Sequence, residues 1–186
     1  MLPTSITQRD SDDQRGTNAR VLAYLLRPEN DSYLVTHENE GRPTTPEFLR
    51  LVTMQQPQIS VLLDVGAQIL DYSNEQVAQA WLEIVHDADG AIYFNPYDQL
   101  MVLTRDGTSF PMSSSAFSPQ LDRCIAYLDH AHTRGTDLKF PLGSRAAVTL
   151  GANVTKDALV QGWFDAVILS SNLTVDEFQV VCGCEN

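Results

Sequence analysis

Residues 124–141 read Cys-Ile-Ala-Tyr-Leu-Asp-His-Ala-His-Thr-Arg-Gly-Thr-Asp-Leu-Lys-Phe-Pro. The first five residues, 124–128, are apolar and are typical of a buried β-strand. Seven of the nine residues at 129–137 carry a polar or ionisable side chain. A buried strand that runs directly into polar residues is typical of the carboxyl end of a strand in an open α/β sheet, where ligands bind. Gly135 allows the backbone to turn there or to approach a ligand closely.

Two other apolar stretches repeat this pattern. Residues 59–66 end in Asp-Val-Gly and residues 146–151 end in Gly, so both are expected to be strands that run into loops. Between strands, Ser73 and Gln76 predict a capping box for an amphipathic helix at 74–85. Strands that alternate with helices predict an α/β fold with a mainly parallel sheet flanked by helices. Strands 59–64, 124–128 and 146–150 are expected to be its adjacent, central members.

The rest of the chain divides by composition and local pattern. Residues 1–18 are polar and are interpreted as a disordered tail or linker, and residues 19–170 as one α/β domain. Residues 171–186 are interpreted as a divergent C-terminal tail, in which 180–184 have no obvious place in a sheet. Shorter elements are also predicted within the domain. They are a helix opened by Pro46 and Glu47, a hairpin of 91–94 and 100–103, a long loop at 108–120, a helix at 156–164 and a strand at 166–169.

Composition limits the class of protein. The chain has 186 residues, of which 43% are hydrophobic and 19% charged, as in a single globular domain. Its net charge of −12 argues against binding to nucleic acid or to an anionic membrane. No apolar run approaches the ~20 residues of a membrane span, and the N-terminus lacks a signal-peptide pattern. The three cysteines are not a disulfide framework, so a reducing intracellular compartment is expected.

One set of residues is suited to thiol catalysis. Cys124 would be the nucleophile, His132 the base that deprotonates it, and Asp129 or Asp137 the carboxylate that orients the base. Cys124, however, begins the apolar run and lies several residues before the polar segment. The alternative is a cysteine buried in the core on a strand.

A second set surrounds Gly135. Thr133, Arg134, Gly135, Thr136 and Asp137 are suited to a nucleotide phosphate or to coupling two lobes across a cleft, with Arg134 on the anion. The alternative is a capped, salt-bridged loop.

A third set concerns metal binding. The His130/His132 and Cys182/Cys184 pairs are each at most half of a metal site, so no metal is predicted. The chain also lacks a Gly-x-x-x-x-Gly-Lys phosphate loop, and no cofactor is predicted.

Several blocks of this sequence resemble a known family. They are Leu62-Leu63-Asp64-Val65-Gly66-Ala67, Ser73-Asn74-Glu75-x-Val77-Ala78, 127–139 and 146–151 followed by Thr155-Lys156-Asp157. In this order they resemble one segment, about residues 16–161, of the very large fungal proteins named ubiquitinyl hydrolase 1, ubiquitin thioesterases of the OTU-like group that contain domains of unknown function. The resemblance implies cysteine-type deubiquitination in the cytosol or nucleus, with ubiquitin or its conjugates as partners.

The same relatives suggest a second hypothesis. They carry an upstream segment that resembles a phosphate-binding loop, and residues 133–138 here are similar to the Arg-Gly-Thr-Asp element in the second motor lobe of the SecA ATPase. This implies a second RecA-like lobe that docks to a first lobe and lines a nucleotide cleft without binding nucleotide tightly alone.

The chain departs from these relatives at two places. His130 stands where they usually have Glu, and residues 162–165 replace their arginine-containing helix. The arginines that complete a motor-type site are therefore missing, which favours a binding or interaction module. A reactive Cys124 of low pKa would favour the hydrolase; a Cys124 buried in the sheet, with Arg134 and Asp137 facing an open cleft, would favour the lobe.

Overall fold

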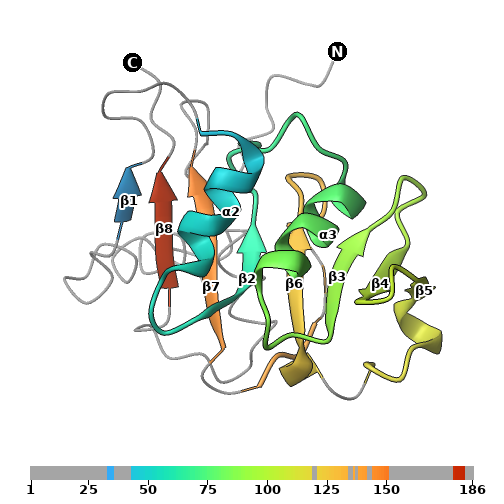
Figure 1. The fold of residues 1–186 in the computed structure, drawn as a ribbon. Coiled ribbons are helices and arrows are strands. Elements are labelled where there is room, and N and C mark those ends of the chain that lie inside the picture. Colours follow the sequence, from blue (N-terminus) through green and yellow to red (C-terminus); the bar gives the residue numbers. More distant parts are fainter. Residues whose placement is uncertain are drawn as a thin grey trace, which may run out of the picture.

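The computed structural model describes residues 43–118, 121–133, 136, 138–141 and 144–150, together with the backbone of two strands at 33–35 and 178–182. The described strands form one eight-stranded sheet with the order β1-β8-β7-β2-β6-β3-β4-β5 (Figure 1). Their bounds are β1 Tyr33–Val35, β2 Ile59–Leu63, β3 Gly90–Phe94, β4 Leu100–Thr104, β5 Ser109–Pro111, β6 Cys124–Leu128, β7 Arg145–Leu150 and β8 Phe178–Cys182.

The prediction of an α/β fold with a mainly parallel sheet is confirmed. All neighbouring strands from β1 to β3 in this order pair in parallel, and only β4 and β5 add antiparallel pairs. The three strands expected to be central are adjacent, because Val61 of β2 pairs with Ala126 of β6 on one side and with Ala146 of β7 on the other. The predicted hairpin is the antiparallel pair β3–β4.

Two helices, α2 (Thr45–Thr53) and α3 (Asn74–Ile84), cover the same face of the sheet (Figure 1). The predicted capping box of α3 is confirmed: the Ser73 hydroxyl accepts the N–H of Gln76 at 3.3 Å, and the Gln76 side chain accepts the N–H of Ser73 at 2.8 Å. At the other end of α3, the Arg105 guanidinium donates to the carbonyl of Leu82 at 3.2 Å. The helix is therefore closed at both ends by side chains, which satisfy backbone groups that have no partner within the helix.

The sheet has a buried apolar cluster on each face. On the helical face, Trp81 is fully buried and its indole N–H donates to Thr53 of α2 at 3.2 Å, so the two helices are joined as well as packed. On the opposite face, Leu138 and Phe140, from the segment between β6 and β7, pack on sheet residues such as Leu63. Because both faces are covered, the central parallel strands read as continuous apolar runs, as is typical of such sheets.

Several boundaries differ from the sequence analysis. The expected tail at 171–186 contains β8, which pairs with β7 over five residues, so that assignment is corrected. The expected loop at 108–120 contains β5 and a 3-10 turn, η2 (Met112–Ser114). A further 3-10 turn, η3 (Leu121–Arg123), leads into β6. The expected tail at 1–18, helix at 156–164 and strand at 166–169 lie outside the described residues.

Candidate functional site

The chain changes crossover direction between the adjacent strands β2 and β6. After β2 it passes through α3, on the helical face, to reach β3. After β6 it passes over the opposite face, where Leu138 and Phe140 pack, to reach β7. In open α/β sheets, such a change creates a crevice outside the carboxyl ends of the two strands, and ligands bind there. We call the residues at this place, 64–69, 129–133 and Thr149, the carboxyl edge.

Asp64 organises the carboxyl edge from within. Its carboxylate is 1% exposed and accepts hydrogen bonds from the hydroxyl of Thr149 at 2.6 Å and from the N–H groups of Gln68 at 2.7 Å and Ile69 at 3.0 Å. The hydroxyl of Tyr127 donates to the same carboxylate at 3.4 Å. Since these donors come from β6, β7 and the loop after β2, the buried charge is satisfied and holds three segments together.

His130 joins the loops after β2 and β6 at the carboxyl edge. Its Nδ1 lies 2.7 Å from the carbonyl oxygen of Val65. A carbonyl oxygen only accepts, so Nδ1 is the donor of this hydrogen bond and Nε2 is left for another partner. The side chain is exposed and no other hydrogen bond within the described residues involves its ring. His130 is therefore the side chain at the switch between β2 and β6 that is free to contact a ligand.

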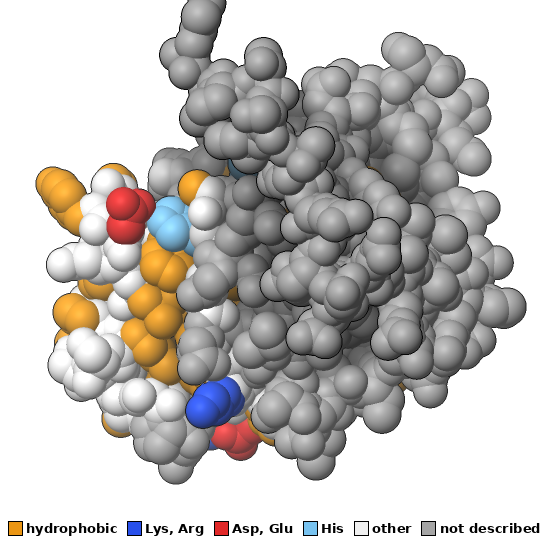
Figure 2. All heavy atoms as spheres, turned by 180° about the vertical axis from the view of Figure 1, so that it is seen from behind, with side chains coloured by type: hydrophobic (Ala, Val, Ile, Leu, Met, Phe, Trp, Pro, Cys, Tyr) orange, Lys and Arg blue, Asp and Glu red, His pale blue; other side chains and the backbone are white. Residues whose placement is uncertain are grey.

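His132 lies between two carboxylates. Its Nδ1 is hydrogen-bonded to Asp129, and its Nε2 lies 3.1 Å from Oδ1 of Asp98, in the turn between β3 and β4. The ring stacks on Phe94 with centroids 4.0 Å apart and planes inclined by 7°. Figure 2 shows a histidine beside an acidic side chain, next to a column of hydrophobic side chains, on the face away from the helices. Through its contacts with Asp98 and Phe94, His132 holds the loop after β6 against the β3–β4 hairpin.

Cys124 lies at the opposite end of β6 from His132 and Asp129. It is the first residue of the strand, is 3% exposed and lies at the amino ends of the parallel strands, which we call the amino edge. Burial, followed by the nearby carboxylates of Asp122 and Asp89, raises the pKa of this thiol to about 12. The structure thus brings together the predicted base and its orienting carboxylate but not the predicted nucleophile, because a straight five-residue strand separates them.

The predicted phosphate loop is described only in part. Arg134, Gly135 and Asp137 lie outside the described residues. Thr133 is 2% exposed and its hydroxyl donates to the carbonyl of His130 at 3.2 Å, while the hydroxyl of Thr136 donates to the carbonyl of His132 at 2.8 Å. Both threonine hydroxyls are therefore used in hydrogen bonds to the backbone of their own loop.

The two histidines expected as half of a metal site do not converge. His130 faces the backbone of Val65, whereas His132 faces Asp129 and Asp98. Within the described part of the chain, no group of three or more His, Cys, Asp or Glu side chains is arranged to hold a metal ion. Of the cysteine pair, Cys182 is described by its backbone as the last residue of β8, and Cys184 lies outside the described residues.

Three contributors to this site were not predicted from the sequence. The sequence pattern places Thr149 only in a strand, Tyr127 only in an apolar run and Asp98 only between the two runs of a predicted hairpin. A weak signal existed for Thr149, because a hydroxyl residue near the end of a buried strand requires a hydrogen-bond partner. No local signal relates Asp98 to His132, since only the sheet order brings the β3–β4 turn near the loop after β6.

Comparison of the chain with protein-family models, curated proteins and solved structures gave no significant match. The family resemblance of the sequence blocks therefore stays a prediction. Neither α2 nor α3, the helices of the described part, has the length and apolar character needed to cross a membrane.

Proposed function

We propose that this chain is a binding lobe of the RecA type, which meets a ligand or a neighbouring lobe through its carboxyl edge. The observation that carries the proposal is the change of crossover direction between β2 and β6, with the exposed ring of His130 bridging the two loops. Residues 133–138 are similar to the Arg-Gly-Thr-Asp element of a second motor lobe, and this similarity supports a binding site at the same carboxyl edge.

The ligand class that follows from this similarity is a nucleoside triphosphate. The chain has no phosphate loop of its own and a net charge of −12, so it would supply one wall of a nucleotide cleft and a first lobe would supply the other. Nucleotide binding by the chain alone is therefore expected to be weak, in the cytosol or nucleus as the resemblance implies. Its main role would be to dock to the first lobe.

The test is a nuclear magnetic resonance titration of the 186-residue chain with ATP up to about 10 mM, which detects millimolar binding. The amide signals of Val65, His130 and Thr136 are expected to shift, and those of Cys124 and Ile125 at the amino edge are not. His130→Ala should reduce the shifts, whereas His86→Ala, an exposed histidine just after α3, should not. Absence of shifts at the carboxyl edge, or equal effects of the two variants, would contradict the proposal.

A second candidate is the thiol-dependent ubiquitin hydrolase that the family resemblance implies. The observation that favours it is the contact between Asp129 and His132, which is the orienting half of a nucleophile–base–carboxylate triad. The position of the nucleophile is unfavourable. Nε2 of His132, which would have to accept the thiol proton, faces Asp98, and Cys124 is buried at the amino edge. Cys182 ends β8 at the carboxyl side of the sheet, but three strand spacings, about 14 Å, separate the backbones of β8 and β6.

Labelling with a ubiquitin probe that carries a thiol-reactive group at its C-terminus distinguishes the two candidates. The binding-lobe proposal predicts no labelling of the wild type. Labelling that is lost both in His132→Ala and in one of Cys124→Ala or Cys182→Ala would replace the lobe by the hydrolase. Labelling that is unchanged in His132→Ala would reflect an accessible thiol and would exclude His132 from the reaction.

A further inference from the structure

His132 connects the loop after β6 with the β3–β4 hairpin through its ring. Nδ1 is hydrogen-bonded to Asp129 of the same loop, and Nε2 lies 3.1 Å from Oδ1 of Asp98 in the turn between β3 and β4. The contact with Asp129 lies within the loop, so it shapes the loop without attaching it to a neighbour. The contact with Asp98 joins two segments that are distant in the sequence, so the position of the loop against the hairpin depends on it.

Both contacts can be hydrogen bonds only when the ring carries two protons. A carboxylate oxygen only accepts, so each ring nitrogen that faces one must be a donor. A neutral imidazole has one N–H group and one lone pair, whereas the imidazolium ion has an N–H group at both nitrogens. The geometry observed around His132 is therefore that of a charged ring between two carboxylates.

The ring is fixed in this orientation by its neighbours. It stacks on Phe94 of β3 with centroids 4.0 Å apart and planes inclined by 7°, and the side chain of His132 is 17% exposed. The hydroxyl of Thr136 donates to the carbonyl of His132 at 2.8 Å and so fixes the backbone at this residue. Because the stacking holds the ring plane, a nitrogen that loses its proton stays directed at its carboxylate.

The charged groups that face the ring come from two elements. Among the described residues, its ion-pair partners are Asp129 on its own loop and Asp98 on the hairpin turn. Phe94, the contact from β3, carries no charge. His130, two residues away, faces the carbonyl of Val65 instead. The proton count of the His132 ring is therefore read by these two carboxylates.

The two carboxylates differ in how readily they leave the ring. Asp129 is 27% exposed, and its Oδ1 also accepts the backbone N–H of His132 at 3.2 Å. Asp98 is 84% exposed, so water can solvate its carboxylate at little cost once the contact is lost. A ring with one proton therefore keeps its N–H group on Asp129. The lone pair of Nε2 then faces Asp98, and the contact between the loop and the hairpin is broken.

We propose that His132 is a proton-dependent latch, which holds the loop after β6 to the β3–β4 hairpin while both ring nitrogens are protonated and releases the hairpin when Nε2 gives its proton to water. The same loop carries His130, the side chain assigned to ligand contact at the carboxyl edge. Control of ligand binding by the latch rests on the proposed function, whereas the latch itself does not.

The experiment is a nuclear magnetic resonance titration of the full chain without nucleotide, from about pH 5 to about pH 9, which covers the usual range of histidine titration. Long-range proton–nitrogen spectra show which nitrogens of each histidine ring carry a proton. Nuclear Overhauser contacts between the His132 ring and the β protons of Asp98 report the latch. These contacts are expected while both nitrogens are protonated and should be lost when Nε2 is not, whereas contacts of His132 with Asp129 should remain. Titration of His86, an exposed ring just after α3, should not affect them.

Asp98→Asn separates the latch from a general effect of pH. An amide group accepts from an N–H group and also donates to a lone pair, so contacts between His132 and the new side chain should persist at every pH. Asp87→Asn, at an exposed position in the turn after α3, is the matched control and should behave as the wild type. Circular dichroism verifies that each variant keeps its fold.

Three results would overturn the latch. They are a His132 ring that never carries both protons in this range, wild-type contacts with Asp98 that persist after Nε2 loses its proton, and contacts that are lost in Asp98→Asn at the same pH as in the wild type. Because no nucleotide is present, these results are independent of the ATP titration. A failure of the latch is therefore distinguished from a failure of the proposed binding site.

Discussion

The buried carboxylate of Asp64 is stabilised by hydrogen-bond donors of the fold that surround it. Thr149, Gln68 and Ile69 donate to it at 2.6–3.0 Å, so the carboxylate exchanges water for three close hydrogen bonds within the fold. This explains why a position that resembles a ligand-binding aspartate at a strand end is instead structural. The group left for a ligand at this edge is the exposed ring of His130, not Asp64.

Asp64→Asn is expected to lower the free energy of unfolding by about 3 kcal/mol. The substitution keeps the shape, but it replaces one acceptor oxygen by an NH₂ group that meets donors instead of acceptors. Urea unfolding monitored by tryptophan fluorescence measures the change, because Trp81 is buried in the folded state. Glu83→Gln, at an exposed position, is the control. A loss of less than about 0.5 kcal/mol would mean that the Asp64 network is not formed.

Cys124 is expected to be inert in the folded protein. Burial raises the pKa of its thiol from 9.0 to about 12, so at pH 8 almost no thiolate is present and alkylation by iodoacetamide should be much slower than in urea-unfolded protein. Because the pKa is raised on folding, the stabilising contribution of the neutral thiol is present below about pH 9 and is lost as the pH rises towards 12. Mass spectrometry of the cysteine-containing peptides checks this, and rapid native labelling at Cys124 would contradict it.

Elements with a strong local signal were predicted correctly, and their residues explain why. The helix α3 combines a capping box with apolar residues at helical spacing, and the hairpin β3–β4 combines two apolar runs with a turn that contains Pro96. β8 carries no such signal. Its sequence, Phe-Gln-Val-Val-Cys, is short and its parallel partners β1 and β7 are distant in the chain, so its place depends on contacts that local pattern does not encode.

Ser73→Ala tests the best-supported element prediction. Loss of the hydroxyl that accepts the Gln76 N–H is expected to cost about 1 kcal/mol in the free energy of unfolding. Ser73→Asn, which keeps a capping side chain, should restore most of this loss. Thermal and urea unfolding of the three proteins provide the comparison. Equal stability of the wild type and Ser73→Ala would show that the cap makes no net contribution in solution.

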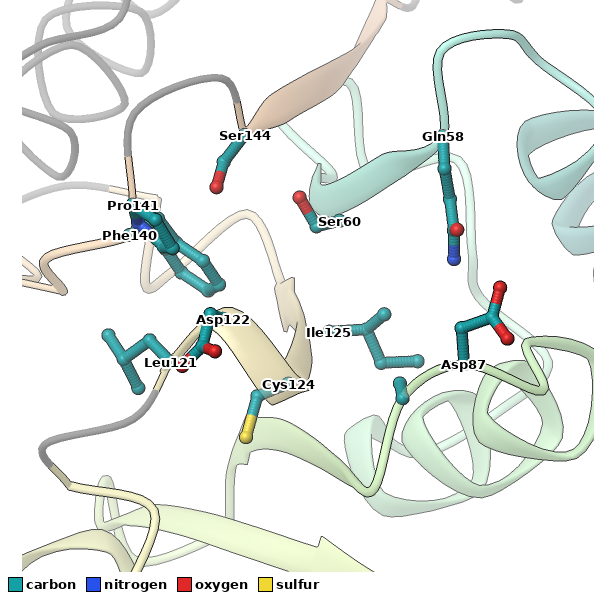
Figure 3. Close-up of a pocket in the computed structure, with 11 residues that line it drawn as sticks. Gln58, Ser60, Asp87, Leu121, Asp122, Cys124, Ile125, Phe140, Pro141 and Ser144 are labelled. Carbon is teal, nitrogen blue, oxygen red and sulfur yellow. The ribbon is translucent and has the colours of Figure 1, made fainter.

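In the whole molecule, two buried clusters share one sheet, and the order of its strands decides which surfaces are available for binding. The carboxyl edge lies where the chain leaves β2 and β6 towards opposite faces. A pocket lined by Ser60 of β2 and Cys124 of β6, among others, lies at the amino ends of the same strands (Figure 3). Cys124 and His132 are only a few residues apart in the sequence, but the direction of β6 places them at opposite edges. The straight strand between them is the physical reason that no joint site forms, and Cys124 is instead a buried cysteine on a strand, the alternative that the sequence left open.

Deletion of residues 171–186 is expected to destabilise the molecule, although the sequence alone suggests a dispensable tail. β8 pairs with β7 over five residues and with β1 over three. Its removal leaves the backbone N–H and C=O groups along one edge of β7 unpaired and takes away the described partner of β1. With each net hydrogen bond worth about 1 kcal/mol, the free energy of unfolding should fall by more than about 2 kcal/mol. Urea unfolding and limited proteolysis measure the effect. Deletion of residues 183–186 alone, which spares β8, is the control, and an unchanged urea midpoint in the longer deletion would show that β8 does not contribute to the stable sheet.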